Sequence, residues 1–263
     1  GIRDRSPSRG LGDVYKRQIL EKGDRNLLAR KFKKFIGFKK KVLEVGCGTG
    51  QLSIYFSLGT NNKIVGFDPT IQSLNLAKNF ADKNEITNIE FINADILTVD
   101  LHKFSSEKLI VFGNLPYNIS SQIILKILEE DFVFLECIFL VQKEMAERFI
   151  SKKEKQNKLS LITEYFGTIH GIFDIPPEAF HPKPKVTSTL IRLVKNNEDR
   201  GLNYQNFKIV LTKCFANPRK KIKAGLKALN LEMEFFSFDI NKRPEELVLE
   251  DFFEILRAYE QQI

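Results

Sequence analysis

The sequence contains few of the residues that build disulfide frameworks and metal sites. Its three cysteines, Cys47, Cys137 and Cys214, lie far apart and form no Cys-x-x-Cys pair, and its three histidines are equally scattered. No apolar run approaches the ~20 residues that a membrane-spanning helix needs, and the longest, residues 132–141, is interrupted by Glu136. We therefore expect no disulfide framework, no metal site and no membrane span, and a reducing, cytoplasmic compartment.

The composition is that of a soluble globular protein. Apolar residues make up 43% and charged residues 28% of the 263 residues, which is enough apolar material for a sizeable core. These values exclude a disordered tail protein and a collagen-like fibre. The length predicts one large domain, alone or with a small appendage.

The excess of positive charge is concentrated in one tract. The chain has 41 basic and 33 acidic residues, for a net charge of +8. Residues 200–231 include eight basic residues and no acidic one, so the rest of the chain is balanced at 33 of each sign. A tract of one sign indicates a polyanionic partner. The alternative is a solvated, lysine-rich surface.

Residues 1–18 (GIRDRSPSRGLGDVYKRQ) differ from the rest of the chain. They contain no apolar stretch of the kind that a secretory signal has, and no hydrophobic period. Their end, DVYKRQ, resembles the translated end of a transposon adaptor used in sequencing libraries. We expect residues 1–18 to be foreign to the protein; the alternative is a natural, disordered basic arm.

From residue 19 onward, predicted strands and helices alternate, which is typical of a mostly parallel sheet with helices on both faces. The polar stretch 194–201 is the predicted linker between a domain at 19–195 and a helical domain at 201–263. No internal repeat is present. The predicted strands are 41–45, 63–67, 89–92, 109–112 and 136–141, and the predicted helices are 25–37, 51–57, 71–82, 119–128, 143–150, 207–215 and 247–259.

A glycine turn follows the first predicted strand in VLEVGCGTG. Gly46, Gly48 and Gly50 allow a tight turn and the close approach of a ligand to the backbone. A dinucleotide fold would show GxGxxG, whereas here the third glycine comes one residue early. With Glu44 before it, the segment resembles motif I of S-adenosylmethionine-dependent methyltransferases. An NAD site and a purely structural turn are the alternatives.

Two carboxylates end the next two predicted strands. Asp68 lies 18 residues beyond Gly50 and is suited to accept hydrogen bonds from both hydroxyls of a ribose. Asp95, in NADIL, is suited to the amino group of an adenine. The glycine turn, Asp68 and Asp95, each after one of three successive strands, together favour a nucleoside-containing cofactor over a purely structural glycine turn.

The tetrapeptide Asn114-Leu115-Pro116-Tyr117 follows the fourth predicted strand. It resembles the motif of methyltransferases that modify exocyclic amines of nucleobases. The amine of adenine is a poor nucleophile, and an Asn oxygen together with the Leu115 carbonyl would accept its two hydrogens and make the lone pair available. Pro116 fixes the turn and Tyr117 offers a face for stacking an extruded base. The alternative is a turn at a strand end.

A second aromatic residue, Phe180, precedes a stiff basic segment in AFHPKPKVTSTLIRL. We expect Phe180 to stack on the base opposite Tyr117, and Lys183 and Lys185 to contact RNA. The alternative is an ordinary connector ahead of an amphipathic strand.

Taken together, these segments resemble the ribosomal RNA adenine dimethyltransferases of the kasugamycin-sensitivity type, whose relatives include the macrolide-resistance enzymes. The resemblance covers residues 19–260 and implies a Rossmann-like, seven-stranded methyltransferase sheet with a small helical C-terminal domain. It is carried by VLEVGCGTG, GNLPYNISSQIILKIL, VQKEMAERF, FHPKPKVTSTLIRL, FANPRKKIKAGL and RPEELVLEDF.

The family implies the reaction and the partner. Its members transfer two methyl groups from S-adenosylmethionine to each of two adjacent adenines in the 3′-terminal hairpin of small-subunit ribosomal RNA, within a 30S particle. The resemblance assigns Gly46, Asp68, Asp95 and Asn114 to the cofactor. It assigns Asn114, Leu115, Tyr117 and Phe180 to the target adenine. We expect a monomer without a metal.

The chain departs from the family pattern at several positions. Cys47 replaces the usual proline, Asp68 the usual glutamate, and FANPRKKI a run of the QRRK type. The family's QxFLxD segment, which closes over the cofactor, is missing except for Leu20, so cofactor binding is expected to be weakened.

Within FANPRKKI, we expect the first turn of a helix at Pro218, with RNA contacts from Arg219, Lys220, Lys221 and Lys223. Two alternatives remain for the function as a whole. One is a large-subunit methyltransferase of the macrolide-resistance type, and the other is a non-catalytic ribosome-assembly factor on the same fold.

Overall fold

The structure is a computed structural model that describes residues 27–37, 41–60, 62–106, 109–130, 132–150, 155–180, 183–196 and 201–263. The predictions for residues 1–18 and for Leu20 lie outside the described residues. Among the described residues, no helix is both long and apolar enough to cross a membrane.

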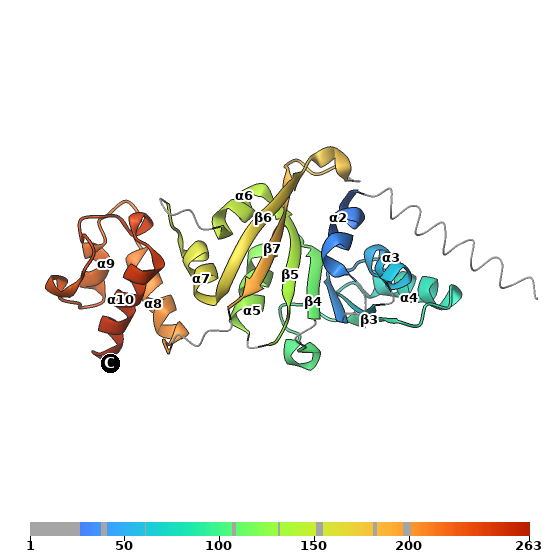
Figure 1. Cartoon of the computed structure of the whole chain (residues 1–263), viewed down its shortest axis with the longest axis horizontal. Coiled ribbons are helices and arrows are strands. Elements are labelled where there is room, and N and C mark those ends of the chain that lie inside the picture. The colour runs from blue at the N-terminus through green and yellow to red at the C-terminus, as the bar shows by residue number, and fades with distance from the viewer. Residues whose placement is uncertain are drawn as a thin grey trace, which may run out of the picture. The chain divides into compact units, whose positions relative to one another are not determined.

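The strands form one seven-stranded sheet in the order β3-β2-β1-β4-β5-β7-β6 (Figure 1). The pairs β1–β2, β2–β3, β1–β4 and β4–β5 are parallel, and β7 is antiparallel to β5. This architecture confirms the predicted Rossmann-like class. The strands are β1 (Lys41–Val45), β2 (Lys63–Asp68), β3 (Ile89–Asn93), β4 (Leu109–Asn114), β5 (Glu136–Gln142), β6 (Gly167–Ile175) and β7 (Ser188–Lys195).

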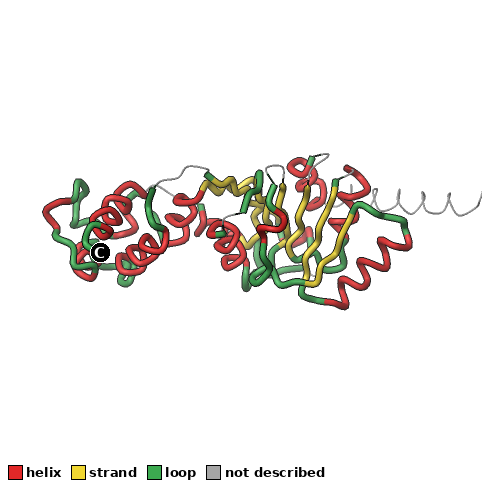
Figure 2. Tube along the Cα trace, turned by 90° about the horizontal axis from the view of Figure 1, so that it is seen from below, coloured by secondary structure: helices red, strands yellow, loops and turns green. Residues whose placement is uncertain are grey.

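Three helices cover one face of this sheet, namely α2 (Leu27–Ile36), α3 (Gln51–Thr60) and α4 (Ile71–Lys83). Alternate strand residues point to this face, and one apolar cluster joins α2 and α3 to Val42 of β1, Ile110 and Phe112 of β4, and Ile138 and Leu140 of β5. Phe32 of α2 and Phe56 of α3 both meet the ring of Phe112, at 5.3 and 5.4 Å between centroids. The helix α5 (Ser120–Glu129) follows β4, and Figure 2 shows helices flanking the strands.

The chain divides into two compact units. One comprises residues 1–143 and 171–194 and the other residues 144–170 and 195–263. The second unit therefore includes α6 (Lys143–Phe149) almost entirely and α7 (Lys158–Phe166), together with α8 (Tyr204–Cys214), α9 (Lys223–Ala228) and α10 (Leu249–Glu260). The domain boundary predicted at residues 195–201 stays a prediction. It divides the chain at one point in the sequence, whereas the second unit combines residues from before residue 171 with residues from after residue 194.

Aromatic side chains hold the second unit together. Tyr165 of α7 stacks on Phe207 of α8 at 5.0 Å, and Phe207 lies 5.8 Å from Phe253 of α10. Phe215 stacks on Phe252 at 5.7 Å. Aromatic pairs of this kind contribute about 0.5–1.5 kcal/mol each beyond the area that they bury.

The sequence patterns missed α7 and β6. The helix α7 (KLSLITEYF) is short and contains a β-branched pair, so propensity alone predicts it poorly; its start is instead defined by Asn157, whose side chain accepts from the amides of Leu159 and Ser160. Four short 3-10 helices, η1 (Leu101–Phe104), η2 (Pro177–Ala179), η3 (Met233–Phe235) and η4 (Pro244–Glu246), complete the described elements.

Candidate active site

The carboxyl ends of four parallel strands bring the predicted motifs to one edge of the sheet. The chain leaves β1 toward β2 and β3 on one side, whereas β4 and β5 lie on the other, so the strand order reverses between β1 and β4. Ligands of open α/β sheets bind in the crevice at such a reversal. Glu44 pairs in register with Phe112, two residues before Asn114, and Asp68 pairs with Asn93, two residues before Asp95.

The glycine turn after β1 has the backbone that its sequence predicts. Gly46, Gly48 and Gly50 have φ angles of +70°, +53° and +72°, a region that residues with a Cβ rarely adopt. Gly50 is also required by space, because a Cβ there would lie 2.5 Å from the ring of Phe91. The turn is tied to the neighbouring strand by the amide of Cys47, which donates to the Phe67 carbonyl at 2.9 Å.

Asp68 connects this turn to the end of β2. Its Oδ2 accepts from the amide of Gly48 at 2.8 Å, and its Oδ1 accepts from the amide of Thr70 at 2.8 Å. Each carboxylate oxygen has a second lone pair. The carboxylate can therefore hold the turn and still accept one hydrogen bond per oxygen from a vicinal diol. This donor set fits a ribose at the edge of the sheet.

Asp95 lies beyond the end of β3, on the same edge. Its side chain is exposed, and Oδ1 accepts from the amide of Leu97 at 2.9 Å. Asn93, at the end of β3, donates from Nδ2 to the carbonyl of Asp68 at 3.0 Å. Asn93 belongs to no motif in the sequence, and its place at the end of a strand is the only signal that marks it.

The Asn114–Tyr117 tetrapeptide begins at the end of β4. Asn114 is exposed, whereas Leu115 is buried and donates its amide to the Leu140 carbonyl at 3.1 Å. A Cβ at Gly46 would lie 3.9 Å from Cδ of Pro116, so the tetrapeptide lies against the glycine turn. Two motifs that are 68 residues apart in the sequence are thereby brought into contact.

The Tyr117 ring is oriented by a residue that the sequence patterns passed over. The Tyr117 hydroxyl and the Ser188 hydroxyl are 2.8 Å apart and form a hydrogen bond. Ser188 is fully buried at the start of β7 and pairs in register with Gln142 of β5. It lies in the proline-spaced segment that was selected for Phe180, but a lone serine carries no signal in a pattern.

Phe180 and its lysines lie in the connection between β6 and β7. Phe180 is half-buried and packs against the cluster formed by α2, α3 and the sheet. Lys183 forms an ion pair with Glu178 at 2.6 Å, and both side chains are mainly exposed, so screening leaves the pair weak. Lys185 is exposed. The stacking of Phe180 opposite Tyr117 and the RNA contacts of both lysines stay predictions.

The basic residues selected in the second unit are all exposed, but the helix start predicted at Pro218 is wrong. Residues 215–222 form turns, with the Lys220 amide donating to the Asn217 carbonyl at 2.9 Å, and α9 begins only at Lys223. The reason is that the Ile222 amide donates to the carbonyl of Lys242, which holds this stretch against another loop. Three of these exposed basic residues, Arg219, Lys220 and Lys221, therefore lie in the turns before α9. The fourth, Lys223, is the first residue of this six-residue helix.

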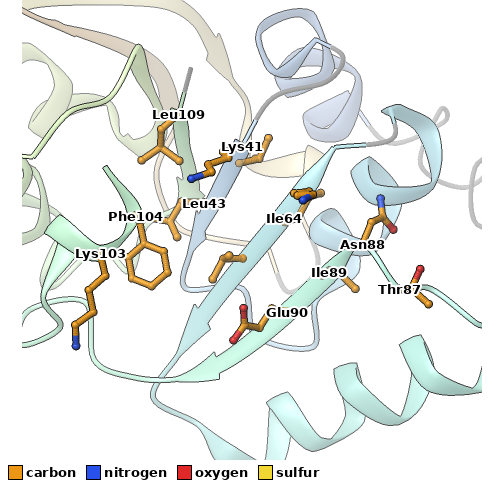
Figure 3. A pocket seen from close by; sticks show the side chains of 13 residues that line it. Lys41, Leu43, Ile64, Thr87, Asn88, Ile89, Glu90, Lys103, Phe104 and Leu109 are labelled. Carbon is orange, nitrogen blue, oxygen red and sulfur yellow. The ribbon is translucent and has the colours of Figure 1, made fainter. Parts of the chain in front are cut away.

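A cavity of about 530 Å³ lies elsewhere on the sheet (Figure 3). It is lined by the first residues of β1 to β4, namely Lys41, Lys63, Ile89 and Leu109. The cavity is therefore at the amino edge of the parallel strands, away from the carboxyl edge that carries Gly46, Asp68 and Asn114. The convergence of the predicted motifs, rather than the size of this hollow, identifies the candidate site.

Glu44 is a buried carboxyl group beneath the glycine turn. It is 3% exposed and accepts a hydrogen bond from the Ser53 hydroxyl of α3. Burial raises the pKa of Glu44 to about 8, an effect that the hydrogen bond from Ser53 reduces and the charge of Asp68 increases. This hydrogen bond joins β1 to α3, the two elements that the glycine turn connects. The predicted role of Glu44 in cofactor binding stays a prediction.

Comparisons with known proteins agree with this arrangement. The family described as Ribosomal RNA adenine dimethylase matches residues 18–261. The chain is 34% identical over 240 residues to "Ribosomal RNA small subunit methyltransferase A" of Francisella tularensis subsp. novicida, covering 87% of this chain and 90% of that protein.

Two solved structures share the fold over most of the chain. A dimethyladenosine transferase from Plasmodium falciparum has a TM-score of 0.76 at 22% identity, covering 89% of this chain and 96% of that one. The 23S rRNA methyltransferase ErmE has a TM-score of 0.60 at 20% identity, covering 92% and 97%.

The buried Glu44 predicts a pH dependence of stability. The carboxyl is neutral in the folded protein up to about pH 8 but ionises near 4.5 in the unfolded chain. Folding is therefore favoured by its proton at low pH, and this contribution is lost as the pH rises from about 4.5 through 8, by up to about 1.4 kcal/mol per pH unit. Glu44→Gln, which stays neutral and can still accept from Ser53, should lack this loss.

The measurement is urea unfolding of both proteins between pH 5 and pH 8. The free energy of unfolding of Glu44→Gln relative to the unchanged protein should increase across this range. A difference that is constant with pH would show that Glu44 ionises normally in the folded state.

Proposed function

Because this chain belongs to the ribosomal RNA adenine dimethylase family, we propose that it transfers methyl groups from S-adenosylmethionine to the exocyclic amines of adenines in small-subunit ribosomal RNA. The observation that carries the proposal is the contact of the glycine turn at Gly46 with Pro116 of the Asn114–Tyr117 tetrapeptide. A cofactor on the turn would have its reactive end beside the residues that hold the target amine.

The residues of the carboxyl edge fit this cofactor. The turn from Gly46 to Gly50 would receive it without steric hindrance from side chains, Asp68 would accept from its ribose hydroxyls, and Asp95 would accept from its adenine amine. When bound, S-adenosylmethionine supplies a methyl group that is attached to a positively charged sulfur. The rest of the cofactor is the leaving group, a neutral thioether. Cys47 takes no part as a thiolate, because burial raises the pKa of its thiol well above the usual range.

Asn114 and Leu115 would activate the acceptor. The Asn114 side-chain oxygen and the Leu115 carbonyl accept the two amine hydrogens, which favours a pyramidal nitrogen whose lone pair faces the methyl group. Orientation and polarisation lower the barrier, and no strong general base is required, because the methylated nitrogen is cationic and then releases its extra proton to water. The exposed position of Asn114 at the end of β4 leaves its side chain accessible to a base from solvent.

Tyr117 would stack on the extruded adenine. Its ring direction is set by the hydrogen bond to Ser188, which anchors the phenol to the start of β7. Phe180, in the connection that leads into β7, is the proposed second stacking partner. A base held between two rings is removed from the helical stack, as enzymes that modify nucleobases require.

The small-subunit target rests on the 34% identical relatives, since the structures that resemble this one show only the fold. In the family pattern, the acceptor is a pair of adjacent adenines in the 3′-terminal hairpin, reached in a 30S particle in the cytoplasm by a monomer during ribosome maturation. The following assay distinguishes this function from two alternatives, which are methylation of the large subunit and a role in ribosome assembly without catalysis.

The test is methyl transfer from labelled S-adenosylmethionine to undermethylated 30S and 50S particles, assayed separately. Label in dimethyladenosine of the 30S particle is expected. Label in the 50S particle alone would indicate the macrolide-resistance branch. Binding of the 30S particle without any transfer, with the family's N-terminal segment restored, would indicate an assembly factor.

Asp68→Ala should weaken binding of S-adenosylmethionine by about 1–3 kcal/mol, because both ribose hydroxyls lose their acceptor and the amide of Gly48 loses its partner. Calorimetry measures the affinity, with Asp82→Ala, an exposed carboxylate of α4, as the control. Binding of NADH, and none of S-adenosylmethionine even with the family's N-terminal segment restored, would contradict the cofactor assignment.

Asn114→Ala should lower the rate of methyl transfer by about 100-fold or more, since the amine is no longer oriented or polarised. Affinity for the 30S particle should stay nearly unchanged, because the amine contact forms only after the base leaves its stack. Single-turnover transfer and filter binding measure the two quantities, with Asn79→Ala on α4 as the control. A fully active Asn114→Ala protein would remove the tetrapeptide from the mechanism.

The exposed basic turn of the second unit should contact the RNA backbone. Changing Arg219, Lys220 and Lys221 together to Gln should weaken binding of the 30S particle and flatten its salt dependence by about two to three units, at about 0.9 per phosphate contact. Affinity for the cofactor should not change, because its proposed site lies in the other unit. An equal salt slope in the triple variant would mean that these side chains are only solvated.

A further inference from the structure

A second basic surface lies on α2, in the unit that carries the candidate active site. Residues 25–41 include eight basic residues and no acidic one, in a stretch about half as long as the C-terminal tract. The chain-wide charge balance conceals this stretch, because acidic residues elsewhere cancel it. Within α2 itself, Arg30, Lys31, Lys33 and Lys34 are basic.

The packing of α2 separates its charges from its apolar side. Ala29, Phe32 and Ile36 are buried in the cluster against the sheet. Arg30 and Lys34, which are four residues apart and so share a face, are both exposed. Among the described residues, no ion pair involves Arg30, Lys31 or Lys34.

This charge pattern opposes the stability of the helix. Like charges three and four residues apart repel, and the first turn of α2 has no acidic residue, whereas only the two basic residues of the last turn, Lys33 and Lys34, suit their end of the helix. A surface that served only solubility would mix the two signs, as α4 does with Lys78, Asp82 and Lys83. The pattern on α2 is that of a surface that meets a polyanion.

The position of α2 relates this surface to the candidate site. Gly37, directly after the helix, accepts a hydrogen bond at 3.0 Å from Asn62, which precedes the first residue of β2, so the last turn of α2 lies at the amino edge of the sheet and its first turn toward the carboxyl edge. Its ten residues span about 15 Å, similar to the length of β1. The ring of Phe32 meets that of Phe112, which is two residues before Asn114.

The same helix touches the segment that leads to Phe180. The ammonium of Lys31 lies 4.1 Å from the centre of the Phe173 ring on β6. Phe173 and Phe180 both pack against the cluster that contains Phe32. The basic face of α2 therefore borders the segment that is proposed to stack on the target base.

We infer that the α2 surface, formed by Arg30, Lys31 and Lys34, binds the phosphate backbone of the RNA strand that carries the target adenine. The inference rests on the proposed function and adds to it a second anchor, independent of the basic turn of the other unit. An arginine suits this role, because its planar guanidinium can contact two phosphate oxygens at once.

The test is the salt dependence of 30S binding by Arg30→Gln/Lys34→Gln. Lys78→Gln/Lys83→Gln is the matched control, since it removes the same charge from exposed positions of another helix in the same unit. The α2 variant should bind more weakly, with a salt slope lower by up to about 1.8, at about 0.9 for each of two contacts. The control should keep the slope of the unchanged protein.

Three further readouts make the result specific. The melting temperature of the α2 variant should not fall, because a like-charge pair is removed, and its affinity for S-adenosylmethionine should not change. Combined with the Gln changes at Arg219, Lys220 and Lys221, the two losses of slope should add. A slope that is unchanged, or that falls equally in the control, would overturn the inference.

The proposed function is tested separately in the same preparation. If the unchanged protein methylates the 30S particle while the α2 variant keeps its salt slope, only the role of α2 fails. If the unchanged protein methylates neither particle, the proposed function fails whatever the slopes are.

Discussion

The parallel pairing of β1 with β2 on one side and with β4 on the other is the constraint on which the candidate site depends. Parallel strands end at the same edge, so the residues that follow β1, β2, β3 and β4 meet although they are far apart in the chain. Asp68 then joins two of these ends through the amides of Gly48 and Thr70. A shift of register by one residue would turn Glu44, Asp68 and Asn114 to the opposite face of the sheet.

Small residues make this convergence possible. Gly66 leaves room for Cys47, since a Cβ there would lie 3.0 Å from its Sγ, and a Cβ at Gly113 would lie 2.5 Å from the carbonyl oxygen of Val45. The glycine turn and the tetrapeptide can therefore approach each other closely. Gly66 belongs to no recognisable motif, and Gly113 directly precedes the Asn114–Tyr117 tetrapeptide. The close contacts that require a glycine at both positions emerge only from the packed strands.

The two basic surfaces differ in how visible they are in the amino-acid sequence. The C-terminal tract is visible in the sequence because its eight basic residues equal the whole net charge. The α2 surface is as basic but leaves no trace in that sum, and its significance depends on which side of α2 is buried. Charge counted along a chain therefore indicates a polyanionic partner, whereas the surface that binds it requires the fold.

The sequence by itself determined the sheet class, the glycine turn and the Asn114–Tyr117 motif, because strand periodicity and backbone conformation are encoded by neighbouring residues. It placed Pro218 at a helix start wrongly and missed α7, β6 and Ser188. The helix α7 begins at a local cap, Asn157, and was missed because its own residues favour a helix only weakly. The turn after Pro218 and the role of Ser188 depend instead on partners distant in the chain, namely the Lys242 carbonyl for Ile222 and the Ser188 hydroxyl for Tyr117. Tertiary structure alone decided these two features, since a hydrogen bond between residues 71 positions apart has no signature in local sequence.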